Sequence, residues 1–174
     1  NSIGEKAFND CNYLTSIQVD ENNEYYDSRN GCNAIIETSS TTLLFGCSNS
    51  TIPYGVTSIG NYAFYYCHNL SSITIPSSVT SIGEEAFYGC SSLSTIVIPS
   101  SVSSIGNSAF RSCSSLTSIS VEESNAYYDS RNGCNAIIET GSNTLIVGCG
   151  NSTIPEGVTS IGNNAFYGCG KLTS

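Results

Sequence analysis

The sequence predicts an α/β solenoid, in which each turn of the chain is one short unit that buries its apolar side against its neighbours. The first observation is a repeat of 23 residues, since the pattern at 56–67 returns at 79–90 and again at 102–113. The second is a longer duplication, because residues 1–72 match residues 103–174 at an offset of 102, with about 50 identical positions. We therefore expect a curved, right-handed coil with a parallel β-sheet on one side, and with short helical turns and two β-hairpins on the other.

The first element of the short unit is a strand, which residues 70–75 illustrate. Its apolar residues are Leu70, Ile73 and Ile75, of which the last two alternate as in a strand, and β-branched residues predominate. Pro76 follows and ends the strand, because proline has no backbone N–H group to donate. Since Ile73, Ile96 and Ile119 recur every 23 residues, the equivalent strands should stack into one continuous parallel sheet.

An inward-facing pair and a short helical segment complete the unit. After a turn at Ser77-Ser78, Val79 and Ile82 supply two further core residues. Residues 83–90 then carry acidic residues first, Ala-Phe in the middle and Gly near the end, which predicts about one and a half helical turns. Ladders of Leu, Ile, Val, Phe and Cys should fill the centre of the coil.

Two units are longer than the others. The single solenoid segment 1–174 consists of ordinary units of 23 residues and two units of 33 residues, at about 20–52 and 122–154. The chain begins and ends in the middle of a unit, so we expect it to be a segment of a longer polypeptide.

A β-hairpin should replace the helical segment in each long unit. In the first, residues 32–38 and 41–47 flank Ser-Ser at 39–40, and the second copy has Gly-Ser at 141–142. Such pairs suit a two-residue turn. The expected register pairs Cys32 with Cys47, Ala34 with Phe45 and Ile36 with Leu43.

The repeat pattern is complete within residues 93–113. Its positions are occupied by Leu93, Ile96, Ile98, Pro99, Val102, Ile105, Gly106, Ala109, Phe110 and Cys113. This pattern, present along nearly the whole chain, resembles the BspA-like leucine-rich repeats, also called the Treponema pallidum type. The resemblance implies a leucine-rich-repeat solenoid, secreted or surface-exposed, of bacteria or of some protists, often adhesive toward host proteins or other cells. It implies no catalytic residues.

The composition argues against nucleic acid and membrane partners. Charged residues make up 11% of the chain, and the formal net charge is −9. The positive residues are few: Lys6, Arg29, Arg111, Arg131 and Lys171. Because affinity for nucleic acid depends on clustered Lys and Arg, we expect no nucleic-acid partner. No apolar run approaches the roughly 20 residues that a membrane-spanning helix needs, so we expect no membrane span in this segment.

The sequence lacks the common patterns of catalytic and metal sites. Its one histidine is His68, and neither a Gly-x-Ser-x-Gly elbow nor a His-Glu-x-x-His pair occurs. Oxygen-rich residues gather at 20–24 and at Asp27, but the second copy does not keep all of them, which favours a polar loop over a calcium site. We therefore expect no enzyme, no cofactor and no metal site.

The nine cysteines fall into two sets. Five hold the same place after Ala-Phe: Cys11, Cys67, Cys90, Cys113 and Cys169. We interpret these as free, buried core residues. The other four form two pairs that are opposed across the hairpins in the expected register: Cys32 with Cys47, and Cys134 with Cys149. Both a disulfide and plain core packing fit these pairs.

One segment is unchanged between the two long units. Residues 27–31, Asp-Ser-Arg-Asn-Gly, recur as 129–133. They could form a recognition loop or a turn fixed by Asp and Gly, in which Arg29 pairs with Asp27 or Glu37. We favour the turn.

Differences between the repeats indicate where a partner could bind. The strands vary little and carry small hydroxyls on their outward side, whereas the segments around each Ala-Phe differ from unit to unit. The best group of anchor residues there consists of Tyr62, Tyr65, Tyr66 and His68, because aromatic side chains dominate the binding energy of protein interfaces. These four residues are the candidate partner-binding site.

Two functions fit these observations. The first is a non-enzymatic extracellular or cell-surface module for adhesion or ligand binding, whose partner is a host extracellular or cell-surface protein or a neighbouring copy of itself. The second is a structural spacer, a stalk or filament segment of a surface assembly, which the near-perfect duplication and the uniform strand face favour. We favour adhesion.

Overall fold

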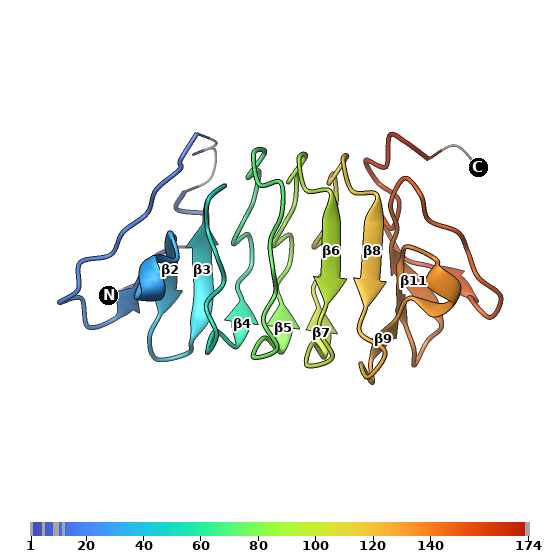
Figure 1. Ribbon diagram of the computed structural model, residues 1–174, viewed down its shortest axis with the longest axis horizontal. Helices are drawn as coiled ribbons and strands as arrows, with labels where there is room; N and C mark the ends of the chain where they lie inside the picture. Colours follow the sequence, from blue (N-terminus) through green and yellow to red (C-terminus); the bar gives the residue numbers. More distant parts are fainter. Residues whose placement is uncertain (1, 5, 9–10, 12, 173–174) are drawn as a thin grey trace.

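The computed structural model describes residues 2–4, 6–8, 11 and 13–172. The chain winds into a stack of short turns, here called rungs, that lie side by side along the molecule (Figure 1). The strands in the described part are β1 (Tyr26–Asp27), β2 (Ala34–Glu37), β3 (Thr42–Gly46), β4 (Ser58–Ile59), β5 (Ser81–Ile82), β6 (Thr95–Ile98), β7 (Ser104–Ile105), β8 (Ser118–Val121), β9 (Tyr128–Asp129), β10 (Ile137–Glu139), β11 (Thr144–Val147) and β12 (Ser160–Ile161). Two short 3-10 turns, η1 (Arg29–Gly31) and η2 (Arg131–Gly133), precede β2 and β10.

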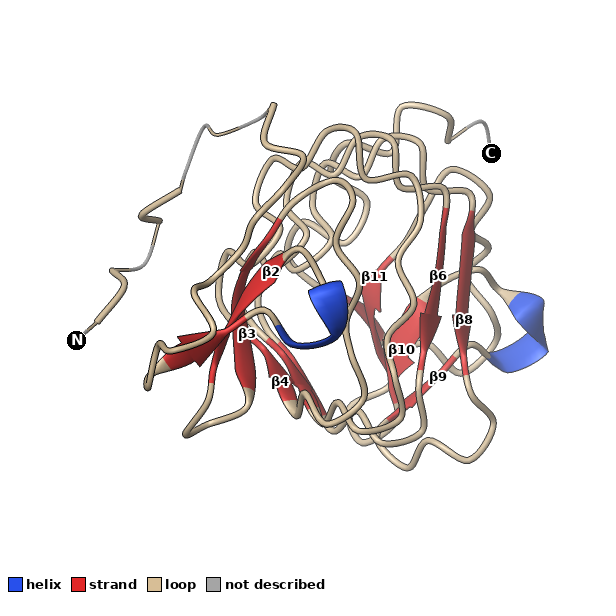
Figure 2. Cartoon of the chain, turned by 60° about the vertical axis from the view of Figure 1, so that its left-hand side comes forward, coloured by secondary structure: helices blue, strands red, loops and turns tan. Residues whose placement is uncertain are grey.

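The described strands form three sheets. In the largest, β4, β5 and β7 are parallel and in register, so that Ile59, Ile82 and Ile105 lie in one line. β3 continues this sheet in parallel, and β2 and β1 extend it as antiparallel strands. The second sheet has the order β12-β11-β10-β9, and the third consists of β6 and β8, which lie away from β3 and β4 (Figure 2).

The sheet expected from residues 70–75 and their equivalents is only partly formed. β6 pairs with β8 in parallel, and Ile96 lies opposite Ile119 as expected. Residues 70–75 are not a strand, so the prediction of one continuous sheet is wrong. Among the described residues, one backbone bond links 70–75 to the next rung, from the Ser94 N–H group to the Ser71 carbonyl. The Ser94 hydroxyl also donates to this oxygen, at 3.3 Å.

The segment around each Ala-Phe is not helical, which corrects a second expectation. In an α-helix, each N–H group bonds four residues back along the chain. Here the N–H groups of Ala86 and Tyr88 bond three residues back within their own rung, whereas that of Phe87 bonds to Ala109 of the next rung at 2.8 Å. The segment is therefore a series of turns that is tied to its neighbours, and we call the stack of these segments the turn column.

Positive φ angles explain why turns form in place of a helix. They recur at every fourth residue, with φ at 59° in Tyr62 and 55° in Tyr66, and at 51° in Glu85 and 72° in Gly89. Each left-handed residue directs the following backbone groups toward the neighbouring rungs. Because this conformation is costly for residues other than glycine, the bonds between rungs offset that cost.

Both hairpins form, and their register differs from the expected one on one side of a β-bulge. Ile36 lies opposite Leu43 as predicted, but Ala34 lies opposite Gly46 and not Phe45. The bulge directly before Ile36 shifts the pairing by one residue, and the alternating pattern of the sequence does not reveal it.

The hairpin loops are longer than the two residues expected. Glu37 and Thr42 are the last pair, so residues 38–41 connect the strands, and Glu139 and Thr144 play the same part in the second copy. The free edge of each hairpin is covered by a third strand, because β1 pairs with β2 and β9 pairs with β10.

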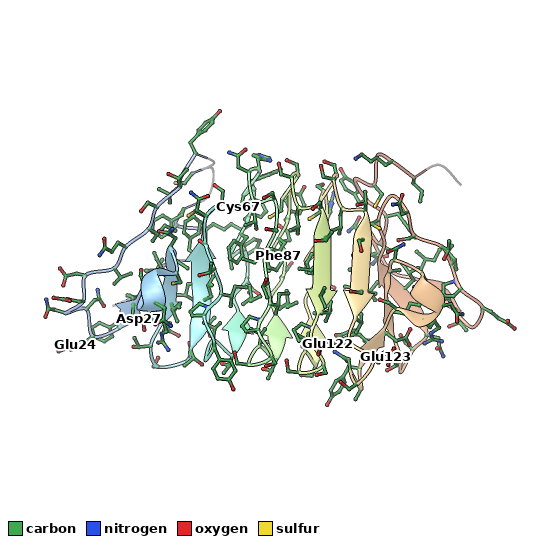
Figure 3. The ribbon with its side chains drawn as sticks, viewed as in Figure 1. Glu24, Asp27, Cys67, Phe87, Glu122 and Glu123 are labelled. Carbon is green, nitrogen blue, oxygen red and sulfur yellow. The ribbon has the colours of Figure 1, made fainter. Side chains whose placement is uncertain are left out.

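A stack of phenylalanine rings runs through the core beside the turn column. Phe64 and Phe87 are parallel with ring centroids 5.1 Å apart, and Phe110 continues the stack at 5.3 Å. Phe87 and Cys67 both lie within the stack of rungs (Figure 3). The ring stack ends at the first long rung, where a Cβ atom on Gly46 would lie 2.2 Å from the ring of Phe64.

Candidate functional site

The structure brings the four predicted site residues together on the outside of the turn column. The rings of Tyr62 and Tyr65 are 5.6 Å apart, and those of Tyr65 and Tyr66 are 4.6 Å apart, both edge to face. His68 continues the group, with its ring 5.2 Å from that of Tyr66. All four side chains are half-buried, so they form one continuous aromatic surface.

Backbone geometry places Tyr62 and Tyr66 in this surface at a cost. Both residues have left-handed φ angles, which bulky residues rarely adopt. Two other rungs have Gly89 and Gly168 at the position of Tyr66. The Tyr66 ring lies over Gly89, where an added Cβ atom would come within 2.4 Å of it. The equivalent residues of other rungs, Glu85, Ser108, Ser112 and Asn164, have left-handed φ angles as well, so this geometry belongs to the turn column.

Neighbouring rungs extend the aromatic surface in both directions. Tyr88 stacks on Tyr65 with ring centroids 5.0 Å apart. On the other side, the Lys6 ammonium group lies 4.1 Å from the centre of the Tyr62 ring, within the range of a cation–π interaction.

The surface continues past Tyr88 to the last rung. The Arg111 guanidinium group lies 5.5 Å from the Tyr88 ring and 3.7 Å from the Tyr167 ring. Ser112 donates its N–H group to the Tyr167 carbonyl at 3.1 Å, so the turn column passes over the second hairpin rung without a break. We call the resulting set of residues the aromatic strip: Lys6, Tyr62, Tyr65, Tyr66, His68, Tyr88, Arg111 and Tyr167.

The sequence prediction does not include four members of the strip: Lys6, Tyr88, Arg111 and Tyr167. A signal for three of them is present in the sequence. Tyr88, Arg111 and Tyr167, like Tyr65, directly follow the Phe of their repeat. Because rungs stack in register, residues at one position of the repeat lie in one column, so aromatic and basic residues at this position predict a strip.

The electrostatics of the strip differ from those of the rest of the chain. A hydrogen bond with Tyr88, together with partial burial, raises the pKa of Tyr66, so this phenol stays neutral at physiological pH. Lys6 and Arg111 place two of the five positive residues against ring faces. The Arg111 Nε–H group is buried and has no hydrogen-bond partner in the described part of the chain.

The strip offers binding groups and no activated nucleophile. The Nδ1 atom of His68 lies 3.3 Å from the Ser91 hydroxyl. Burial raises the pKa of the nearby Cys67 thiol to about 12. In the part of the chain that the structure describes, no three His, Cys, Asp or Glu side chains are grouped to hold a metal ion, and no helix is long and apolar enough to cross a membrane.

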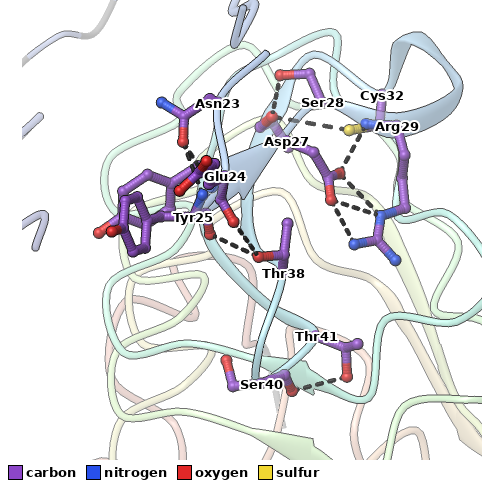
Figure 4. Close-up of polar contacts among 12 residues, drawn as sticks. Asn23, Glu24, Tyr25, Asp27, Ser28, Arg29, Cys32, Thr38, Ser40 and Thr41 are labelled. Carbon is purple, nitrogen blue, oxygen red and sulfur yellow. Dashed lines mark hydrogen bonds and ion pairs between the residues drawn. The ribbon is translucent and has the colours of Figure 1, made fainter. Parts of the chain in front are cut away.

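The unchanged segment 27–31 is a structural turn. Arg29 donates several hydrogen bonds to the carboxylate of Asp27, and the one from Nε to Oδ1 measures 2.8 Å (Figure 4). Arg131 and Asp129 repeat this arrangement in the second copy. Because each guanidinium group is occupied by its own carboxylate, these contacts support the turn over the recognition loop.

The cysteine pairs of the hairpins are core residues with free thiols. The Cys32 thiol donates to the Ala34 carbonyl at 3.8 Å, and the Cys47 thiol donates to the Asn33 carbonyl at 3.6 Å. Both side chains are buried. The sequence allows either a disulfide or core packing for these pairs, and the structure shows core packing.

The repeats match a known family along most of the chain. The BspA type leucine rich repeat region matches in six copies, over residues 1–42, 36–140 and 146–174. The chain belongs to the BspA-type leucine-rich repeat family. This confirms the family resemblance and the leucine-rich-repeat fold that the sequence indicates.

Crystal structures of three bacterial proteins are similar to this leucine-rich repeat chain. They are a leucine rich cell surface protein from Faecalibacterium prausnitzii A2-165 (37% identity, TM-score 0.61), the pneumococcal vaccine antigen PcpA (27%, 0.56) and the T. pallidum leucine rich repeat protein (32%, 0.51). The matches cover 68%, 70% and 74% of this chain, which spans 32%, 37% and 56% of the respective proteins. No curated protein matches the chain in sequence.

Proposed function

We propose that this chain is a non-enzymatic protein-binding module of a surface-exposed protein, and that the aromatic strip is its binding surface. The observation that carries the proposal is the continuity of the strip. Ring contacts between 4.6 and 5.6 Å join Tyr62, Tyr65, Tyr66 and Tyr88. Lys6 lies on the Tyr62 ring at one end, and Arg111 connects Tyr88 to Tyr167 at the other.

The chemistry of the strip supports recognition of a protein. Tyrosine and arginine are enriched among the residues that dominate protein interfaces. Tyrosine provides a large contact area and a hydroxyl group. Because its side chain has few rotatable bonds, it loses little conformational entropy on binding. The outward residues of β6 and β8 are mainly small hydroxyl residues, so they provide no comparable anchors.

We further propose that the partner is an extracellular or cell-surface protein, either of a host or a neighbouring copy, and that the module acts in adhesion at the cell surface. Family membership and the likeness to a leucine rich cell surface protein and to a vaccine antigen support this location. A curved, right-handed coil would present the strip along one edge.

The test is capture of purified extracellular and cell-surface proteins on an array by the immobilised chain. Replacing Tyr62, Tyr65 and Tyr66 with Ser should lower the affinity for the captured partner at least tenfold, because interface aromatics contribute about 1 kcal/mol or more each. The matched control replaces three exposed tyrosines outside the strip, Tyr25, Tyr54 and Tyr127, with Ser. The control variant should bind as the parent does.

Two outcomes would contradict the proposal. If both triple variants lose affinity equally, the strip is not the specific binding surface. Failure of the parent chain to capture any protein would favour the alternative function, a structural spacer in a stalk or filament.

Because the chain is acidic, a basic partner should associate more slowly as the salt concentration is raised.

A further inference from the structure

A groove separates the rung at 102–113 from the second hairpin rung. Its volume is about 250 Å³, and its lining includes Ile105, Ser108, Phe110, Val147 and Asn164. The duplication places an equivalent groove in the first copy, with a volume of only about 100 Å³. Its lining occupies the same positions 102 residues earlier: Ile3, Lys6, Phe8, Phe45 and Tyr62.

Three differences between the copies open the second groove. In each case a large residue of the first copy becomes a smaller one in the second: Lys6 becomes Ser108, Phe45 becomes Val147, and Tyr62 becomes Asn164. In the first copy the Phe45 ring stacks on Phe8 with centroids 4.5 Å apart and fills the space. In the second copy Val147 is too short to do so, and the equivalent space beside Phe110 is open.

One wall of the open groove carries two unpaired backbone donors. In the interior of the stack, the N–H groups of Glu85 and Phe87 donate to carbonyls of the next rung at 3.0 and 2.8 Å. Ser108 and Phe110 hold the same positions in their rung, but neither N–H group bonds to any described residue. The reason is topological, because the next rung is a hairpin in which β11 already pairs with β10.

The donors at the two ends of this stretch are occupied. The Ile105 N–H group donates to the Tyr128 hydroxyl at 3.0 Å, and the Ser112 N–H group donates to the Tyr167 carbonyl at 3.1 Å. The groove therefore presents a short stretch of backbone with unpaired N–H groups, between two N–H groups that are already bonded.

We propose that this groove binds a short peptide segment of a partner protein through backbone hydrogen bonds. In the interior of the stack, the donors at these two positions meet the Asn107 and Ala109 carbonyls, so a peptide that presents two such carbonyls would complete the same pattern. One side chain of the peptide enters the space that Phe45 fills in the first copy. Because that space adjoins Phe110 and Val147, the peptide should carry an aromatic or large aliphatic residue there.

This site goes beyond the aromatic strip, although Arg111 and Tyr167 border both. The strip offers side-chain surface, whereas the groove offers backbone donors and a small space next to Phe110 and Val147. Substitutions at Val147 and at the tyrosines of the strip therefore separate the two sites.

The test begins with selection of a phage-displayed library of random nonapeptides on the chain, with counter-selection on the Val147→Phe variant. The first copy already has Phe at this position, so the fold has room for the ring. Enriched peptides should bind the parent and lose at least tenfold in affinity with Val147→Phe. A second variant, Asn164→Tyr, narrows the groove at its rim and should also weaken binding.

Amide hydrogen exchange locates the contact. In the free chain, the amides of Ser108 and Phe110 should exchange faster than those of Glu85 and Phe87, and bound peptide should slow them.

The strip variant that replaces Tyr62, Tyr65 and Tyr66 with Ser should keep the peptide affinity at the second groove. The proposal is overturned if no peptide is enriched over the counter-selection, or if enriched peptides bind Val147→Phe as tightly as the parent. It is also overturned if only non-peptide ligands, such as glycans, protect the Ser108 and Phe110 amides.

Discussion

The buried cysteines that follow Ala-Phe in the repeats also form hydrogen bonds through their thiols. The thiols of Cys90 and Cys113 donate to the carbonyls of Phe64 and Phe87 in the preceding rung, both at 3.2 Å. Each of these carbonyls also accepts a backbone hydrogen bond within its own rung, from the N–H group of Cys67 or Cys90, so the thiol adds a second bond that alanine could not make. The sequence predicts five buried free cysteines in this ladder. The structure confirms burial for Cys67, Cys90 and Cys113, but Cys11 is exposed and Cys169 is only half-buried, because both lie in the outermost rungs of the described chain.

These thiols should be unreactive in the folded chain. Burial raises the pKa of Cys67 and Cys113 to about 12 and that of Cys90 well above its usual value, so the reactive thiolate is scarce at pH 8. We expect iodoacetamide to modify the exposed Cys11 in the native chain and to reach the other three only in denaturant. Peptide mass spectrometry is the measurement, and rapid native modification of Cys90 would contradict the prediction.

The Asp-Arg pairs beside the hairpins should make stability depend on pH. The hydrogen bond from Arg29 lowers the pKa of Asp27, and at Asp129 burial opposes but the hydrogen bonds from Arg131 prevail. Because the pKa of each carboxyl group is lower in the folded than in the unfolded chain, the charged carboxylate stabilises the folded chain at pH values above the unfolded pKa. This stabilisation is lost as the pH falls through the folded pKa.

The double variant Asp27→Asn, Asp129→Asn isolates this contribution. The parent should be more stable than the variant above about pH 4, and the difference should vanish toward about pH 2. Urea unfolding at a series of pH values measures it. A difference that does not change with pH would show that the carboxylate charges contribute nothing.

At the scale of elements, the long rung depends on a glycine that receives a phenylalanine ring. Gly46 in β3 and Gly148 after β11 would each place a Cβ atom 2.2 Å from the ring of Phe64 or Phe166. The sequence shows glycine at both places, but its role appears only when the hairpin strand is seen in the place of an Ala-Phe segment.

Replacement of Gly46 with Ala should therefore destabilise the chain by about 1–3 kcal/mol, because the ring stack has to shift. Gly141→Ala in a hairpin loop is the control, since a Cβ atom there meets nothing within 4 Å. Urea melts of both variants test the prediction. Equal stability of the two would mean that Phe64 does not pack on Gly46.

Elements were predictable where a side-chain pattern alone decides them. The pairing of Ile36 with Leu43 follows from apolar alternation, and the structure confirms it. The bulge beside this pair and the loop at 38–41 depend on backbone choices that leave no mark in the pattern of apolar residues. The helical segment at 83–90 fails for a related reason, because its composition suits helix and turns alike.

At the scale of the whole molecule, stability should spread from rung to rung. Phe87 is fully buried between Phe64 and Phe110, with the three rings nearly parallel. Phe87→Ala should cost about 3–5 kcal/mol, because the neighbouring rungs hold their spacing and leave a cavity. In a solenoid each rung is stabilised by its neighbours, so amide exchange should speed up in the rungs on both sides.

Tyr54→Ala is the control, because Tyr54 is 78% exposed and should change stability by less than about 0.5 kcal/mol. Urea unfolding combined with hydrogen exchange provides both measurements. A loss below about 1 kcal/mol for Phe87→Ala, or faster exchange confined to its own rung, would contradict the coupled stack.

The sequence by itself determined the period, the family and the core. Apolar residues that recur every 23 positions can be buried together only by stacking the units in register, so the Ile59, Phe64 and Cys67 ladders follow from spacing. For the same reason, the tyrosines of one rung could be named as a surface group from the sequence.

Only the tertiary structure decided how the rungs join. Whether residues 83–90 form a helix or turns depends on whether the next rung accepts their N–H groups, and that rung lies 23 residues away. The aromatic strip reaches Tyr167 because the turn column passes over a hairpin. The groove exists because that hairpin satisfies its own edge and leaves Ser108 and Phe110 unpaired. Such contacts between distant segments depend on which backbone edges meet. The pattern of apolar and polar side chains along the sequence does not specify which edges these are.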